Sequence, residues 1–279
     1  MNSRKIRIGT GQLLVEGGEP ERNLLRAGEI VKEASFKKCD IVLLPECLDL
    51  GWTHPSAKVE AQPIPGPYSD NLSRLAKEYN VYICAGLTEK YINRVYNTAI
   101  LINSLGDIIL KYNKINLLVV EQDFYTVGRD LSVVETPFGA IGVNICADNY
   151  MDALEIGHVL ARMGAQLILS PSSWTVDYSH IDDTNPYGEK WFKPFFTIAN
   201  LYNLTIASAT SVGYIVGGPY EGKKMVGCSL VVGKDGIIAQ GTYNEFASEL
   251  VIAEINISPR IERGTAIGEM LSRKGYYKK

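Results

Sequence analysis

The chain has few histidines, and its cysteines are not closely spaced in pairs. The 279 residues include three histidines, none in an HExxH pattern or at the spacing of two metal ligands. The five cysteines are widely spaced without a CxxC pair, which is not typical of a disulfide scaffold or a structural zinc site. We therefore expect reduced thiols, no metal and no cofactor. The histidines are His54, His158 and His180, and the cysteines are Cys39, Cys47, Cys84, Cys146 and Cys228.

The sequence also lacks an excess of charge of one sign and a long apolar run. Its 28 basic and 31 acidic side chains give a formal net charge of -3, without the basic cluster that binding to nucleic acid or an anionic membrane would need. No run approaches the roughly 18 apolar residues of a membrane helix. The first residues do not form a signal-peptide pattern. We expect a cytoplasmic protein that binds neither nucleic acid nor membranes.

Strand-like and helix-like runs alternate along most of the chain. Apolar periodicity predicts helices at 20–36, 67–80, 153–163 and 189–202. It predicts strands at 5–15, 40–44, 81–88, 166–169, 204–209 and 250–255. Predicted hairpins pair 97–103 with 107–112, 131–135 with 140–146, and 225–232 with 237–241. This mixture predicts an α/β fold, a four-layer αββα sandwich of two mixed sheets.

No linker, low-complexity run or internal repeat divides the chain. We therefore predict a single domain over residues 1–279, with a core at about 5–257 and a C-terminal arm at 258–279. The arm carries charge and two tyrosines without a strong pattern. It is either a surface arm or a dimer contact.

The most informative segment is AIGVNICADNY, residues 140–150. An alternating apolar strand runs into Cys146, and a polar helix start follows. A thiol at a helix N-terminus lies beside free backbone N–H groups and the positive end of the helix dipole, which favour its thiolate. Cys146 is therefore a candidate nucleophile. Taken by itself, a free cysteine is more often a small buried side chain.

Two other chemically active side chains follow strands in the same way. Glu46 comes after the buried run IVLLP, at the carboxyl end of a strand, where α/β sheets place their sites. Lys114 follows the strand DIILKYN, and Glu121 lies seven residues further on. Each has a plainer explanation: an acid that faces a loop, a lysine that extends to solvent, or an acid that only neutralises the lysine.

The combination of these residue types predicts chemistry on an unreactive carbonyl. Such a reaction needs a base for the thiol proton, a positive charge or N–H donors for the oxyanion, and an acid for the leaving nitrogen. A carboxylate, a lysine and a thiol each follow a strand, and no histidine occupies a comparable place. This disfavours a cysteine–histidine arrangement of the papain type.

Several motifs resemble the nitrilase, or carbon–nitrogen hydrolase, superfamily. LLPECLDLGW contains Glu46, KYNKINLL contains Lys114, and GVNICADNYMDALEIG contains Cys146, in the order of the family. EQDFYTVG places Glu121 and Gly128 like the family's second glutamate and the glycine after it. WFKPFFTIANLYNLTIASATSVG and GCSLVVGKDGIIAQG are similar to its later segments, so the resemblance spans about 5–257. It implies an αββα fold, a homodimer formed through the helices near the nucleophile, and a metal-free thiol mechanism.

The resemblance also implies a role for each side chain. Cys146 would attack the carbonyl or nitrile carbon, with Glu46 as general base and then as proton donor to the departing amine. Lys114 would stabilise the oxyanion, aided by a backbone N–H beside Cys146, and water activated by Glu46 would hydrolyse the thioester. Glu121 would orient Lys114 or the substrate nitrogen. A lysine between two glutamates keeps its charge, and partial burial raises the pKa of a glutamate.

The substrate is less well indicated than the reaction. Family branches that hydrolyse carbamoyl amino acids or dicarboxylic acid amides often carry an arginine shortly after the acid that follows the nucleophile, whereas Asp148 here precedes Asn149, Tyr150 and Met151. No cation stands there to bind a carboxylate. We predict an amidase for a small linear amide, with a nitrilase or an N-carbamoyl amidohydrolase as the alternative. An acyltransferase or an inactive binding scaffold is the alternative of a different class.

Some side chains near these motifs are candidates for the substrate pocket. Trp52, Trp174 and Tyr150 are typical of a small-molecule pocket, although an aromatic side chain is more often part of a core. Asn149 follows the nucleophile in a stretch similar to that of nitrilases. The polar, turn-rich segment 175–187 is either a lid over the site or an inert surface loop.

Overall fold

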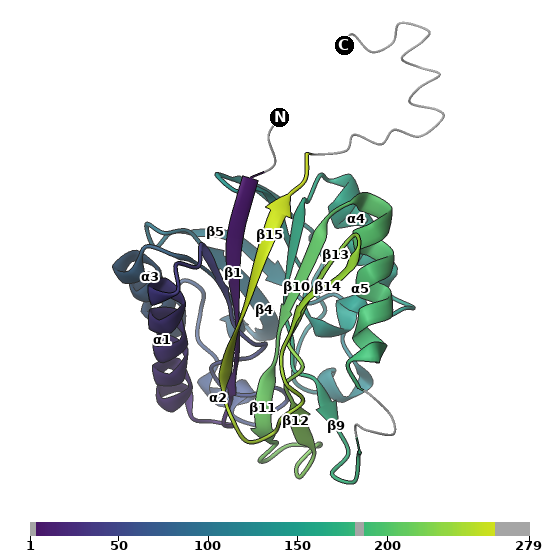
Figure 1. Ribbon diagram of the computed structural model, residues 1–279. Coiled ribbons are helices and arrows are strands. Elements are labelled where there is room, and N and C mark those ends of the chain that lie inside the picture. The colour runs from purple at the N-terminus through teal and green to yellow at the C-terminus, as the bar shows by residue number, and fades with distance from the viewer. Residues whose placement is uncertain (1–3, 182–186, 260–279) are drawn as a thin grey trace, which may run out of the picture.

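The computed structural model describes residues 4–181 and 187–259, which form two β-sheets packed face to face (Figure 1). Helices α1 (Pro20–Phe36) and α3 (Pro67–Tyr79) cover the outer face of the first sheet. Helices α4 (Leu154–Arg162) and α5 (Glu189–Tyr202) cover the outer face of the second. The predicted four-layer αββα sandwich of two mixed sheets is therefore confirmed. A short helix, α2 (Ala57–Glu60), lies in the loop before α3.

Parallel strands occupy the centre of each sheet. Among the described residues, the first sheet has the order β5 (Ile108–Asn113), β4 (Arg94–Ile102), β3 (Tyr82–Tyr91), β2 (Ile41–Leu43), β1 (Arg4–Leu14), β11 (Ser211–Tyr214), β12 (Lys224–Val226), β9 (Thr175–Val176). Strand β15 (Glu249–Ile257) also pairs with β1. The second sheet has the order β14 (Gly236–Gln240), β13 (Leu230–Gly233), β10 (Thr205–Ala209), β8 (Leu167–Pro171), β7 (Gly139–Val143), β6 (Val133–Thr136). The pairs β1/β2, β2/β3, β7/β8 and β8/β10 are parallel.

The central strands are apolar because both of their faces are covered. All three residues of β2 are buried, and Leu43 and Val143, one from each sheet, belong to a core shared by the two inner faces. On the outer face, Leu24, Ala27 and Val31 of α1 repeat every three or four residues and pack against the first sheet. Proline in the first turn of α1 fits the start of a helix, where no backbone donor is lost.

Most predicted elements are found, and one predicted strand is wrong. The run 225–232 is divided between β12 of the first sheet and β13 of the second. Between them, Gly227 and Cys228 have φ of +68° and +62°, and this turn takes the chain from one sheet to the other. Strands β9 and β11 and the β3–β4 hairpin, which turns at Ile92, were not predicted. Within the described ranges, no helix is long and apolar enough to cross a membrane.

The topology brings the carboxyl ends of β2, β5 and β7 close together. Strand β5 runs antiparallel to β4, and β4 runs antiparallel to β3, which is parallel to β2. The carboxyl ends of β2 and β5 therefore lie at the same end of the first sheet. Strand β7 ends in the second sheet, across the shared core. The segments after β2, β5 and β7 carry Glu46, Lys114 and Cys146.

Candidate active site

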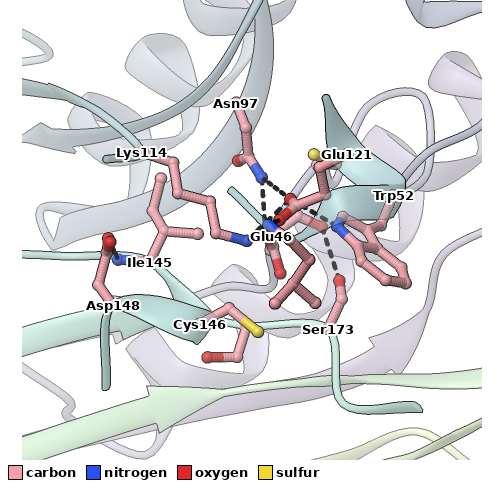
Figure 2. Close-up of polar contacts among 12 residues, drawn as sticks. Glu46, Trp52, Asn97, Lys114, Glu121, Ile145, Cys146, Asp148 and Ser173 are labelled. Atoms are coloured by element: carbon pink, nitrogen blue, oxygen red, sulfur yellow. Dashed lines mark hydrogen bonds and ion pairs between the residues drawn. The ribbon is translucent and has the colours of Figure 1, made fainter. Parts of the chain in front are cut away.

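The side chains of Glu46, Lys114 and Cys146 converge between the two sheets (Figure 2). Lys114 follows β5 directly, and its ammonium nitrogen lies 2.8 Å from Glu46 Oε1. A 3₁₀ turn at Val119–Glu121 returns the second glutamate to the same nitrogen, at 2.8 Å from Oε1 and 3.0 Å from Oε2. The structure thus brings together the four residues predicted as catalytic. Glu46 and Glu121 are fully buried, and Lys114 is 1% exposed.

The lysine keeps its charge in this buried place. Burial lowers the pKa of Lys114, but the charges of Glu121 and Glu46 outweigh burial and hold that pKa well above its ordinary value. Two carboxylates and one ammonium group leave the cluster with a negative charge when both glutamates are ionised. Of these three side chains, only Lys114 can therefore stabilise a group that becomes negative during a reaction.

Glu46 has one carboxylate oxygen that is bonded and one that is not. Oε1 accepts from Lys114 and, at 2.6 Å, from Asn97 Nδ2. Oε2 is buried without a hydrogen-bond partner among the described residues. Burial raises the pKa of Glu46, although Lys114 opposes this increase. A buried carboxylate with a raised pKa and a free oxygen is suited to taking up and giving back a proton.

Gly86 of β3 lets the backbone of Glu46 lie close to the sheet. A Cβ atom at residue 86 would lie 2.6 Å from the Glu46 Cα atom and 3.0 Å from the Pro45 oxygen. Gly86→Ala is therefore expected to lower the free energy of unfolding by about 1–3 kcal/mol, because backbone atoms must move. Urea unfolding measures this change. In the control Gly28→Ala, on α1, the added atom would meet Leu75 at 3.7 Å, so no stability should be lost. Equal stability of the two variants would contradict the close approach at Gly86.

Cys146 does not begin an α-helix. It opens a single 3₁₀ turn, Cys146–Asn149, with a φ of +43°, and α4 starts later, at Leu154. Burial raises the pKa of the Cys146 thiol well above its ordinary value, and the charge of Glu46 raises it further. Lys114 and a hydrogen bond from the Ser173 backbone lower it by less. The predicted helix N-terminus at Cys146 is therefore wrong, and burial opposes the thiolate that was expected there.

Two residues that the sequence did not reveal hold the cluster in place. Asn97 of β4 donates from Nδ2 to Glu46 and also, at 3.2 Å, to Glu121 Oε1. Asp148 accepts from the Tyr112 hydroxyl at 2.7 Å and from the backbone N–H groups of Asn116 and Ile145 at 2.9 Å each. Asp148 thereby ties the chain on both sides of Lys114 to the residue before Cys146.

Trp52 belongs to the same hydrogen-bonded cluster. The residue is 4% exposed, and its indole N–H donates to Glu121 Oε1 at 2.8 Å (Figure 2). Glu121 also accepts from the backbone N–H of Leu118 at 2.8 Å. With Lys114, these donors fix both oxygens of the second glutamate. Contact of Trp52 with a substrate stays a prediction, and its polar atom bonds to a carboxylate.

The other predicted pocket residues lie around the 3₁₀ turn of Cys146. Asn149 is almost fully buried, and its amide bonds to Asn144, to Ser170 Oγ at 2.8 Å and to the Cys146 carbonyl at 3.3 Å. Tyr150 stacks on Trp191 with ring centroids 5.0 Å apart, and the fully buried Trp174 stacks on Trp191 at 4.7 Å. Contact of these side chains with a substrate stays a prediction.

The predicted lid, 175–187, falls partly outside the described residues. Its first two residues form strand β9, which pairs with β12 at the edge of the first sheet. Most of the predicted C-terminal arm, from residue 260 onward, also lies outside them. In 4–181 and 187–259, no group of three or more His, Cys, Asp or Glu side chains could hold a metal ion.

The αββα sandwich, with a glutamate, a lysine and a cysteine after strands of its two sheets, has the architecture of the nitrilase type. The sequence profile of the carbon-nitrogen hydrolase family matches residues 7–262. The chain therefore belongs to this family, which confirms the resemblance and the enzyme class expected from the motifs.

Several relatives of the chain are omega-amidases. One from Xenopus tropicalis is 31% identical over 182 residues, which cover 62% of this chain and 65% of the relative. The chain thus spans less than two thirds of the length of that relative. A chloroplastic omega-amidase of Arabidopsis thaliana is 29% identical over 287 residues, which cover 97% of this chain and 73% of the relative.

Solved structures share the fold at low identity. A carbon-nitrogen hydrolase from Helicobacter pylori has a TM-score of 0.80 at 21% identity, and covers 98% of this chain and 93% of its own. An amidase from Nesterenkonia sp. has a TM-score of 0.76 at 20% identity and covers 92% of each chain. Both similarities support the sandwich architecture.

Proposed function

We propose that this protein hydrolyses a small linear amide through a thioester on Cys146. The observation that carries the proposal is the buried cluster in which Lys114 is bonded to Glu46 and Glu121, while Glu46 Oε2 has no partner within the described chain. This arrangement supplies a base, a cation and a thiol in a place shielded from water. A binding scaffold has no need of all three, and burying them without a function costs stability.

The proposed reaction begins with proton transfer from Cys146 Sγ to Glu46. The sulfur then attacks the carbonyl carbon, and the oxyanion is stabilised by the Lys114 ammonium and a backbone N–H beside Cys146. Glu46 next gives its proton to the amide nitrogen, the carbon–nitrogen bond breaks and ammonia or an amine leaves. Water then transfers a proton to Glu46 and attacks the thioester. Breakage of the carbon–sulfur bond releases the acid, and the proton returns from Glu46 to the thiol.

An amide is the substrate best supported by the relatives. Several of them are named omega-amidases, and the amidase from Nesterenkonia sp. has been solved with butyramide and with acrylamide added to its active-site cysteine. A nitrile or a carbamoyl compound is the alternative, since both present a carbon bonded to nitrogen to the thiol. Transfer of the acyl group to an amine, in place of water, is the alternative of a different class.

Ammonia release and intact mass together test the proposal. The protein is incubated with butyramide, an N-carbamoyl amino acid or butyronitrile, and a covalent adduct is sought by mass spectrometry. We expect ammonia and a transient acyl adduct with butyramide. Cys146→Ala should give neither, whereas the matched Cys39→Ala should retain both. Absence of ammonia and adduct with every compound would overturn the proposal, and an adduct discharged only by an added amine would replace hydrolysis by transfer.

The pH dependence of the rate offers a test of Glu46 as the base. A base must be deprotonated, so kcat/KM should fall as the pH falls through the Glu46 pKa. Because that pKa is raised by burial, the acid limb should lie above the ordinary glutamate value of about 4.3. Asn97 donates a hydrogen bond that lowers the pKa, so Asn97→Ala should move the limb to higher pH.

The control for this profile is Asn113→Ala. Asn113 accepts a hydrogen bond from Thr98 and lies beside Lys114 in sequence, but it does not bond to Glu46. In Asn113→Ala, kcat/KM should fall at the same low pH as in the unchanged protein. A limb that stays in place, or moves to lower pH, in Asn97→Ala would show that another group controls the rate.

We further propose that the protein is a cytoplasmic homodimer built from single domains. The helices α4 and α5 cover the second sheet beside Cys146. Val159 of α4, Met163 just after it and Leu201 of α5 are 42%, 39% and 41% exposed. A second copy could cover these apolar side chains. Light scattering on the full chain gives the mass in solution, and a monomer at micromolar concentration would contradict the dimer.

A further inference from the structure

One buried hydroxyl contacts both ends of the segment 47–53, which follows Glu46. The hydroxyl belongs to Tyr125, which is 4% exposed, and it accepts a hydrogen bond from the backbone N–H of Thr53 at 3.1 Å. The same oxygen lies 3.5 Å from the sulfur atom of Cys47. A single side-chain atom therefore connects the first and the last residue of this segment.

The two residues that contact the hydroxyl have a strained backbone. Cys47 has a φ of +45° and Thr53 a φ of +57°, so both lie in the left-handed region. In this region the Cβ atom of an L-residue crowds the following carbonyl oxygen, and a β-branched residue such as threonine is especially rare there. Thr53 Oγ1 is buried without a partner among the described residues, so the threonine side chain does not stabilise its own turn. Such conformations persist only where surrounding groups hold them.

The segment 47–53 is attached to two side chains of the buried cluster. Glu46 directly precedes it, and Glu46 Oε1 lies 2.8 Å from the ammonium nitrogen of Lys114. Trp52 lies within it, and its indole N–H donates to Glu121 Oε1 at 2.8 Å (Figure 2). A change in the backbone of the segment would therefore displace a base and a donor of the cluster together.

Tyr125 is fixed to the opposite side of the same cluster. Its backbone N–H donates to the backbone oxygen of Glu121 at 2.9 Å, and its ring belongs to an apolar cluster that includes Cys47 and Trp52. Burial raises the pKa of Tyr125 well above its ordinary value, so the hydroxyl stays neutral near neutral pH. Among the described residues, this hydroxyl bonds to none of the four side chains predicted as catalytic. It can affect the reaction only through the groups that it holds.

We propose that Tyr125 is a positioning residue, whose hydroxyl holds the segment 47–53 so that Glu46 and Trp52 face Lys114 and Glu121. Its effect on turnover rests on the amide hydrolysis proposed above. Without the hydroxyl, the strained backbone would relax and Glu46 would move away from the ammonium group. A displacement of about 1 Å at a reacting group can lower a rate about a hundredfold.

The test replaces Tyr125 by phenylalanine, which removes one oxygen and keeps the ring in the apolar cluster. With butyramide, kcat per folded protein should fall about 10- to 100-fold, and KM should change little, because the hydroxyl does not touch the substrate. Lys114 lowers the pKa of Glu46, so a weaker contact between them should move the acid limb of kcat/KM to higher pH.

Tyr202→Phe is the matched control. It removes the same atom from a hydroxyl that lies 2.9 Å from His158 Nδ1, between the outer helices α5 and α4. This variant should keep kcat, KM and the acid limb of the unchanged protein.

A glycine at residue 53 tests the role of backbone strain. Thr53→Gly keeps the N–H that bonds to Tyr125, and glycine adopts a positive φ without strain. Tyr125→Phe should therefore lower kcat less in Thr53→Gly than in the unchanged protein. Equal losses in the two backgrounds would overturn the inference, because the hydroxyl would then not oppose strain at Thr53.

The outcomes separate this inference from the function on which it rests. No ammonia from butyramide in the unchanged protein would defeat the proposed function, and the inference with it. Ammonia from the unchanged protein, with normal kcat and an unmoved acid limb in folded Tyr125→Phe, would overturn the inference alone. A loss of activity in Tyr125→Phe that only follows the loss of folded protein would also overturn it, because Tyr125 would then be purely structural.

Discussion

Replacing Lys114 by methionine is expected to abolish amide hydrolysis and to destabilise the fold. We expect kcat/KM to fall by at least about a thousandfold, because the cation that would face the oxyanion is lost. The free energy of unfolding should fall by about 3–5 kcal/mol, the usual effect of removing one partner from a buried ion pair. Both effects follow from the position of the ammonium nitrogen, 2.8 Å from oxygens of Glu46 and of Glu121.

The variant would leave two carboxylates facing each other in the core. The N–H groups of Asn97 and Trp52 would still bond to them, but neither group carries charge. One glutamate should therefore keep a proton near neutral pH, with a pKa raised above its unfolded value. An acid with a raised pKa stabilises the folded state at low pH and loses that contribution as the pH rises. The stability deficit of Lys114→Met should thus be larger at pH 8 than at pH 5.

A lysine in β5, the strand that precedes Lys114, serves as the control. Lys111 of β5 pairs with Glu89, which is 1% exposed, outside the candidate site. Lys111→Met should lower stability through the same physical effect but leave ammonia release from butyramide within a few-fold of the unchanged protein. Urea unfolding and an ammonia assay on both variants complete the comparison. Near-normal turnover by folded Lys114→Met would contradict the oxyanion role.

The fold was largely predictable because its decisive signals are local. Helix α1 begins at Pro20 and ends at Phe36 as predicted, since a proline at its start and an apolar stripe mark it within a short stretch. The division of 225–232 between two sheets depends on a turn at Gly227 and Cys228 whose packing partners lie elsewhere in the chain. A continuous apolar run predicts one strand, and it contains no signal that its two halves join different sheets.

The candidate site was predictable where its residues follow strands or lie in a recognisable motif. Glu46, Lys114 and Cys146 each follow a strand, and Glu121 was found from its motif. Asn97 lies within β4, and its amide reaches glutamates 51 and 24 residues away in sequence. A buried amide in a largely apolar strand was the available signal. The direction of the Cys146 pKa was mispredicted because burial, which raises that pKa, depends on the whole sandwich.

Glu46→Gln is expected to abolish hydrolysis and yet leave the fold stable. Glutamine can keep its carbonyl oxygen in the place of Oε1, where it would accept from Lys114 and Asn97. Its amide group would replace Oε2, which has no partner among the described residues. Lys114 would keep its ion pair with Glu121 at 2.8 Å. The free energy of unfolding should therefore change by no more than about 1 kcal/mol.

The loss of activity follows from charge alone. The neutral amide cannot take the proton of the Cys146 thiol, whose pKa is raised by burial, and it cannot give a proton to the leaving nitrogen. We expect kcat/KM for butyramide to fall by at least about a thousandfold. Glu89→Gln changes a buried glutamate that pairs with Lys111, outside the candidate site, in the same way and should retain turnover.

Stability distinguishes the two losses of function. Lys114→Met should be inactive and destabilised, because it leaves buried charge unpaired, whereas Glu46→Gln should be inactive at nearly full stability, because it removes a charge that burial disfavours. Parallel unfolding curves and ammonia assays give both quantities for each variant. If Glu46→Gln lost activity only in proportion to folded protein, Glu46 would be a structural partner of Lys114. If it turned over at a normal rate, the base would have to be sought in Glu121, which contacts the same ammonium group.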